Sequence, residues 1–324
     1  MSLSTAPTSA ARGSLIRRSS RAAVARRRRR VLFIALCLLP SFALLVLFNY
    51  YPLLSALYHS LFRWDGYNPP AFVGLQNFAQ MWSDSAVTTG LKNLAILAVA
   101  TVAISLTLPL LAAELALAVR GQRLFKTYRA LLVIPIVVPQ LITLLIWAFM
   151  FDPSVGVINA LLRAIGLGSV APQWLGDTHI ALYSIILAGV SSGFPWVAGL
   201  NFLIYLAALQ NISPEIHDAA RLDGAVGWRR MISIDVPLIA GQLRLIITLA
   251  LIAVTQTFTS VWVLTQGGPG NATMVPGVAL YQQGFQFGNF GYASAIGALI
   301  FVVMLALTVL SNAIGQMIQR RQGV

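Results

Sequence analysis

Six stretches of this chain are apolar over roughly 20 residues or more, the length that an α-helix needs to cross the hydrocarbon core of a membrane. Only 10% of the 324 residues are charged and 58% are hydrophobic, whereas a soluble domain carries about 25% charged residues. Lipid is therefore the expected solvent. The sequence predicts an all-α polytopic membrane protein with six transmembrane helices, at about residues 32–51, 94–117, 131–151, 180–209, 243–264 and 292–314.

The basic residues indicate the orientation of these helices. If the N-terminus lies inside, every Lys and Arg except Arg63, Lys92 and Arg163 falls on the inner side or at its edge. Lys and Arg are enriched on the cytoplasmic side of membranes, so both termini are expected in the cytoplasm. The net charge of +13 is thus explained by topology, and nucleic-acid binding is not indicated.

The N-terminal tail is distinct from the apolar part of the chain. Residues 1–30 are rich in Ser, Ala and Arg, end in the run Arg26–Arg30 and offer little to bury. We therefore expect a disordered basic cytoplasmic tail over residues 1–30. Residues 31–324 are expected to form the six-helix domain, including a cytoplasmic loop at residues 211–240.

The buried part of the sequence offers no catalytic chemistry. Glu114 is the one acidic residue inside a predicted span, near its cytoplasmic end, and the histidines His59, His179 and His217 are far apart. No nucleophile–base set and no metal-ligand spacing is found, and Cys37 is the one cysteine. The sequence predicts no catalytic residue, no metal and no cofactor bound directly, so uphill transport would need energy from another polypeptide.

The cytoplasmic loop reads as two short helices joined at a glycine. Ser213 suits an N-cap and Pro214 the first helical position, and Gly224 supplies a left-handed residue after Leu222. A second helix from about Gly227 is expected to stop before Pro237. The loop mixes both charge signs with small apolar residues, which favours a protein socket; an amphipathic helix resting on lipid headgroups is the alternative.

At this loop the chain resembles a known family. The run D-A-A-R-L-D-G-A from Asp218, with nine residues between its Gly224 and the I-D-V-P that ends at Pro237, is similar to the E-A-A…G…I-x-L-P motif of binding-protein-dependent ABC importer permeases. Asp218 stands where the family usually has Glu, and Val236 where it usually has Leu. The resemblance implies a type I importer permease fold and a coupling helix docked on a cytoplasmic ATPase, with the docking residues Glu215, Asp218, Ala219, Ala220, Asp223, Gly224, Ala225 and Pro237.

Three further stretches resemble the carbohydrate branch, specifically the first permease subunit of maltose-type sugar importers. They are F-V-G-L-Q-N-F at 72–78, L-T-Q-G-G-P at 264–269 and G-Y-A-S-A at 291–295. The resemblance implies import of a sugar or oligosaccharide by alternating access in the bacterial inner membrane. It also implies four kinds of partner: a second homologous permease, two ATPase subunits that carry ATP-Mg, an extracytoplasmic solute-binding protein and the sugar.

A sugar site is expected where predicted spans are interrupted and carry polar side chains. Trp196 could stack on a sugar ring, Ser192 and Gly193 leave room, and polar residues follow in the fifth span. In the family these two spans line the pocket, which implies roles for Gly193, Trp196 and Thr257. Close helix packing through Gly189 and Gly193, and backbone bonding by the Thr and Gln side chains, are the alternatives. The candidate set is Ser192, Gly193, Trp196, Gln256, Thr257 and Thr259.

Other functions remain open from the sequence. A permease for glycerol 3-phosphate would be expected to place Arg or Lys in the cavity, and the candidate pocket has neither. An autonomous secondary transporter would be expected to keep ionisable groups near the midplane of the membrane. A non-transporting membrane scaffold would not stimulate a bound ATPase in response to substrate.

Overall fold

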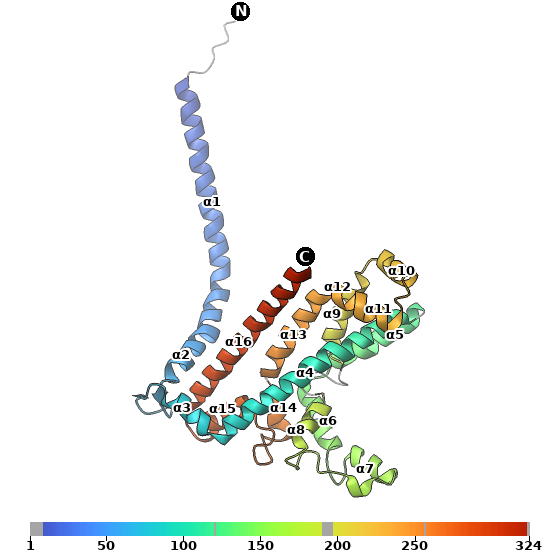
Figure 1. Ribbon diagram of the computed structural model, residues 1–324. Helices are drawn as coiled ribbons and strands as arrows, with labels where there is room; N and C mark the ends of the chain where they lie inside the picture. Colours follow the sequence, from blue (N-terminus) through green and yellow to red (C-terminus); the bar gives the residue numbers. More distant parts are fainter. Residues whose placement is uncertain (1–8, 120, 190–196, 256, 323–324) are drawn as a thin grey trace, which may run out of the picture. The chain divides into compact units, whose positions relative to one another are not determined.

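The computed structural model describes residues 9–119, 121–189, 197–255 and 257–322. The chain divides into two compact units, Met1–Ala56 and Leu57–Val324. Both are helical, and the strands among the described residues are one short antiparallel pair, β1 (Phe62–Arg63) and β2 (Ala71–Phe72). The prediction of an all-α chain is confirmed (Figure 1).

The first unit is dominated by helix α1 (Ser9–Leu45), which continues through a π-helical turn, η1 (Val46–Tyr50), into α2 (Tyr51–His59). Residues 9–30 are therefore helical where the sequence predicts a disordered tail. Their many Ala and Arg residues have high helix propensity, which gives a physical reason for the difference. The stretch Arg27–His59 is long and apolar enough to cross a membrane, and its apolar side chains are exposed, Leu32 and Phe33 by 67% and 68%.

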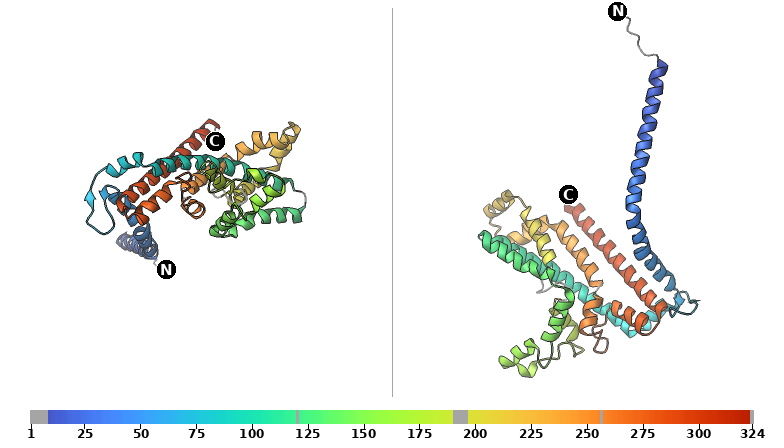
Figure 2. Two further views of the ribbon diagram at one scale, coloured as in Figure 1. Left: turned by 90° about the horizontal axis from the view of Figure 1, so that it is seen from below. Right: turned by 180° about the vertical axis from the view of Figure 1, so that it is seen from behind.

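Three long helices form the frame of the second unit. Helix α13 (Ala240–Thr255) packs against both α4 (Ser85–Ala118) and α16 (Phe290–Gln322), and α9 (Gly199–Gln210) packs along α4 (Figures 1 and 2). The close approach of α9 to the chain at Leu132 explains why residue 199 is a glycine, since a Cβ there would lie 2.8 Å from the carbonyl oxygen of Leu132. Helix α4 and the first part of α16, Phe290–Val309, are each apolar enough to span a membrane.

Two predicted spans are broken. The stretch 131–151 is not one helix, because α5 (Gln122–Val133) passes through a 3₁₀ turn, η2 (Ile134–Val137), and then bends by 94° into α6 (Gln140–Met150). Pro135 and Pro139 lie in the bend, where each lacks the N–H of a continuous helix. The stretch 243–264 divides into α13, which ends at Thr255, and α14 (Phe258–Leu264).

The number of spans stays a prediction. Among the described residues three helices are long and apolar enough to cross a membrane, or up to five if each bent pair is one span; the second pair is Gly227–Leu238 with α13, bent by 79°. The predicted span 180–209 contains α8 (Ala181–Leu187) and α9, but residues 190–196 lie outside the described residues.

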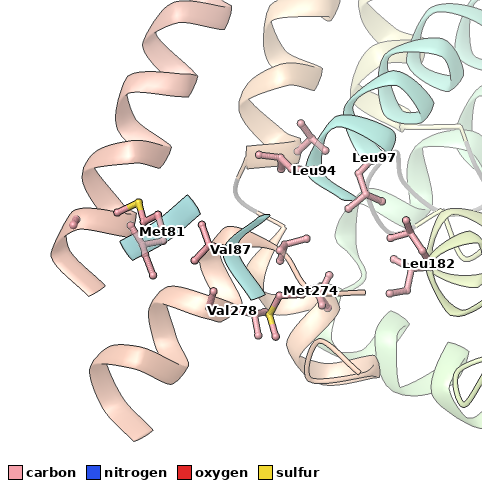
Figure 3. Close-up of a cluster of buried hydrophobic side chains, with 14 of the residues drawn as sticks. Met81, Val87, Leu94, Leu97, Leu182, Met274 and Val278 are labelled. Atoms are coloured by element: carbon pink, nitrogen blue, oxygen red, sulfur yellow. The ribbon is translucent and has the colours of Figure 1, made fainter. Parts of the chain in front are cut away.

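Short helices gather at the end of the second unit that the sequence predicts to be external. They surround a cluster of buried apolar side chains from α4, α8 and the chain after α14, among them Val87, Leu97, Leu182 and Val278 (Figure 3). The short elements of this end, here called the external cap, are α3 (Gln76–Ser83), α7 (Val157–Ala164), η3 (Gly168–Val170), α15 (Pro276–Tyr281) and η5 (Gln282–Gln286).

The three stretches that resemble the sugar branch connect these caps. Asn77 donates from Nδ2 to the carbonyl oxygens of Ser60 (2.8 Å) and Phe62 (2.9 Å). After α14, the hydroxyl groups of Thr265 and Thr273 are hydrogen-bonded to each other, with their oxygens 2.7 Å apart. At the start of α16, the N–H of Gly291 donates to the Trp64 carbonyl (3.0 Å). In this structure these motif residues hold the external cap together.

Asn93 of α4 provides a further link, and its removal is expected to destabilise the cap. The buried Nδ2 donates to the carbonyl oxygens of Ala272 and Met274, each at 2.9 Å. Asn93→Leu leaves both carbonyls without their donor, which should cost about 2 kcal/mol and lower the midpoint of thermal unfolding in detergent. Asn289→Leu, at an exposed amide, is the control; equal midpoints for the two variants would contradict this role.

Candidate functional site

The loop that the sequence predicts to be cytoplasmic begins with α10 (Pro214–Leu222), as expected. Ser213 occupies the N-cap position, but its side chain bonds the Glu215 carboxylate and caps no backbone N–H. The helix ends in a Schellman motif: the N–H of Ala225 donates to the Ala220 carbonyl (2.8 Å), and Gly224 adopts a φ of 70°. The prediction that Gly224 ends this helix in a left-handed conformation is confirmed.

The second helix of the loop departs from the prediction. Helix α11 (Gly227–Arg230) continues as a π-helix, η4 (Met231–Asp235), and as α12 (Val236–Leu238). The helical path thus includes Pro237, where we expected it to stop. In the π-helical turn the N–H of Val236 reaches back five residues to the Met231 carbonyl. This wider turn gives the proline ring room that a regular α-helix denies it.

Most of the predicted docking residues lie at the surface of the two-helix segment formed by α10–α12, here called the knob. Two of them do not: Ala220 is 3% exposed and Ala225 is 8% exposed, so both pack inside. The exposed members of the predicted set are Glu215, Asp218, Ala219, Asp223, Gly224 and Pro237.

The knob also exposes large apolar side chains that the sequence analysis did not select. Leu222 is 90% exposed, Val226 is 62% exposed and Trp228 is 64% exposed. The exposed ion pair between Asp218 and Arg221 (3.1 Å) lies on the same helix as Leu222. Exposed apolar side chains with charged neighbours are typical of protein–protein interfaces. The signal in the sequence was the placement of a Leu, a Val and a Trp around the helix-ending glycine.

The second candidate site, for substrate, is only partly described. Ser192, Gly193, Trp196 and Gln256 lie outside the described residues. Thr257 is buried, and its hydroxyl donates to the Val254 carbonyl (2.8 Å), whereas Thr259 is exposed. Nearby, Gln140 of α6 donates to the hydroxyl of Ser260 (3.1 Å). Gly189 has a φ of 67° after α8 ends, so it does not act as a helix-packing glycine there.

A large groove elsewhere in the second unit does not suit a polar solute. It has a volume of 660 Å³, and Thr255 is its one polar lining residue. The remaining lining side chains are apolar and come from α4, α13 and α16. The polar break between α13 and α14 remains the better candidate for a hydroxylated ligand, since the sequence from 245 to 291 carries no charged residue.

Comparison with solved structures shows that this architecture is shared by importers. The chain superposes with a TM-score of 0.78 on a bacterial ABC transporter involved in the import of the acidic polysaccharide alginate, with 91% of this chain and 99% of that chain covered at 21% identity. The same transporter in complex with an alginate pentasaccharide-bound periplasmic protein also gives a TM-score of 0.78, at 22% identity. This likeness confirms the type I importer permease fold.

Sequence comparison gives the same result. The chain is 30% identical to the probable ABC transporter permease protein YurN of Bacillus subtilis, over 85% of this chain and 93% of that protein. It is 32% identical to the diacetylchitobiose uptake system permease protein NgcF of Streptomyces coelicolor (87% and 80%). It is 33% identical to the sn-glycerol-3-phosphate transport system permease protein UgpA of Agrobacterium fabrum (83% and 89%).

The family model for the binding-protein-dependent transport system inner membrane component matches residues 105–324, a range that includes the whole knob and the polar break. This range covers more than half of the chain and agrees with the motif at Asp218–Pro237. The chain therefore belongs to the family of binding-protein-dependent transport system inner membrane components, the permeases of ABC importers.

Proposed function

We propose that this permease imports a neutral sugar or oligosaccharide by alternating access. The supporting observation is that the sequence from 245 to 291, which includes the break between α13 and α14, carries hydroxyl and amide side chains but no charged residue. Hydroxyl and amide groups bind sugar hydroxyls, whereas an anionic substrate calls for Arg or Lys. The permease for diacetylchitobiose among the relatives supports the same substrate class.

Glycerol 3-phosphate is the second candidate substrate, because UgpA proteins are equally similar to this chain. A phosphate monoester carries a charge of about −1.5 to −2 at neutral pH, and the cationic side chain that binds it would then come from a partner subunit.

The knob is proposed to dock on a cytoplasmic ATPase subunit. Its exposed Leu222, Val226 and Trp228 provide the apolar centre of the contact, with Asp218 and Arg221 at its edge. Two such ATPases carrying ATP-Mg, a second homologous permease and an extracytoplasmic binding protein would complete the importer. Both termini would lie in the cytoplasm, with hydrolysis confined to the ATPase subunits and no cofactor held by this chain.

In this scheme ATP binding closes the ATPase pair, which moves the docked knob and opens the cavity outward. The binding protein then releases substrate into the cavity, and hydrolysis returns the permease to its inward-facing state. Binding energy of the nucleotide shifts the population between the two states because the closed ATPase pair contacts only one of them favourably.

Reconstitution tests this function. The complete complex in proteoliposomes should accumulate a radiolabelled oligosaccharide, with diacetylchitobiose as the first probe. The binding protein is added outside the vesicles, and ATP is enclosed inside them, on the side of the ATPase subunits. Glycerol 3-phosphate is assayed in parallel, and preferential uptake of it would replace the sugar by the second candidate. Uptake by this chain without ATPase subunits would contradict the importer mechanism and indicate a secondary transporter.

A further inference from the structure

A partly buried chain of two carboxylates, an arginine and a histidine joins the knob to the inner end of α4. Arg230, at the end of α11, donates from Nη2 to Oε2 of Glu114 (2.6 Å) and from Nε to Oδ2 of Asp235 (2.8 Å). The second oxygen of Asp235, Oδ1, lies 3.1 Å from Nε2 of His217 on α10. We call these four residues the charge bridge.

The burial of the charge bridge is unlike that of the other ion pair of the knob. Asp235 is fully buried, Glu114 is 12% exposed and Arg230 is 24% exposed, whereas both partners of the Asp218–Arg221 pair are more than two-thirds exposed. Exposed pairs contribute little, but a buried group that loses its partner is left with an uncompensated charge. The four groups are therefore constrained to move together.

Side chains, more than backbone packing, make this connection. A hollow of 640 Å³ lies between α10 and the inner ends of α4 and α9, and three members of the charge bridge, Glu114, His217 and Arg230, line it. Arg230 bridges two carboxylates that are 121 residues apart in sequence. A guanidinium group can do this because its donors are held in one rigid fork.

We infer that Arg230 is a positioning residue for transport, which transmits the movement of the knob to helix α4 through Glu114. This inference rests on the proposed docking of the knob. Glu114 is the one acidic residue within a predicted span, and its pairing with Arg230 explains why a charge is kept at the membrane edge. The ATPase contact and helix α4 are then energetically linked through one arginine.

Arg230→Lys tests the inference in the complete reconstituted complex. Lysine keeps the positive charge, but its single ammonium group does not reproduce the two-sided fork. We expect the variant to assemble with the ATPase as well as wild type does. Transported substrate per ATP hydrolysed should fall about tenfold, which corresponds to a coupling loss within the usual range for allosteric linkage. Glu114→Gln should give a similar fall.

The double variant and a control separate coupling from stability. Arg230→Lys with Glu114→Gln should lose no more coupling than either single variant, because both remove the same link. Arg123→Lys, at an exposed arginine of α5 outside the knob, should transport normally. The inference is overturned if Arg230→Lys and Glu114→Gln keep the wild-type ratio of transport to hydrolysis, or if transport falls only in proportion to the amount of assembled complex. If the wild-type complex itself shows no ATP-driven uptake, the proposed function fails first.

Discussion

Leu222→Asp is expected to prevent stable binding of the ATPase subunit to the permease. Leu222 is the most exposed large apolar side chain of the knob, 90% exposed, and follows the exposed pair Asp218–Arg221 on the same helix. A carboxylate there would have to lose its water in the contact without a partner. Loss of a hot-spot residue at the centre of an interface costs about 2 kcal/mol or more, so affinity should fall at least about thirtyfold. Co-purification and titration of the detergent-solubilised subunits measure the effect.

A matched control distinguishes docking from folding. Leu124 lies on α5, is 61% exposed and is also predicted to be cytoplasmic, so Leu124→Asp introduces the same charge outside the knob. This variant should bind the ATPase normally. Thermal unfolding of both variants should match wild type, since neither leucine is buried. Wild-type affinity in Leu222→Asp would rule out the exposed apolar face of the knob as the docking surface.

Gly291→Ala is expected to cause the largest loss of stability at the external cap. A Cβ on this residue would lie 2.1 Å from the carbonyl oxygen of Phe62 and 3.0 Å from the backbone N of Trp64. Both obstacles are backbone atoms of the β1 region and cannot rotate away. Overpacking of this kind costs about 3 kcal/mol, and the midpoint of thermal unfolding should fall by about 6–12 °C.

Gly241→Ala is the corresponding control. Gly241 lies in α13, where an added Cβ would have no neighbouring atom within 4 Å. Alanine also has a higher helix propensity than glycine. Its unfolding midpoint should stay level or rise. If Gly291→Ala unfolds at the wild-type temperature, the contact between the start of α16 and β1 is not close in the folded protein.

Much of the second unit follows from local sequence signals. Apolar length gives α4 and α16, and Pro214 and Gly224 give the start and the observed end of α10, because a first-turn proline and a left-handed glycine act within a few residues. The motif from Asp218 to Pro237 places the knob in an importer permease. These features depend on neighbours in sequence, which is the information that a single chain provides.

Other features depend on contacts between distant segments and were missed. The 94° bend at Pro135 and Pro139 needs the packing of α5 against α9 to decide between a kink and a break. The pairing of Glu114 with Arg230 joins residues 116 positions apart, and no sequence spacing indicates it. The burial of Ala220 and Ala225 likewise follows from the Schellman turn that folds one toward the other. From the sequence alone, the buried small residues of the loop cannot be told apart from the exposed ones.

The exposed Leu222, Val226 and Trp228 have a consequence for how a cell would assemble the importer. A permease made without its ATPase would present these side chains to the cytoplasm, where chaperones and proteases recognise unburied apolar segments. Docking would hide them. Degradation of undocked permease would thereby keep its amount matched to that of the ATPase. Permease abundance in cells should fall when the ATPase gene is silenced and recover when it is restored.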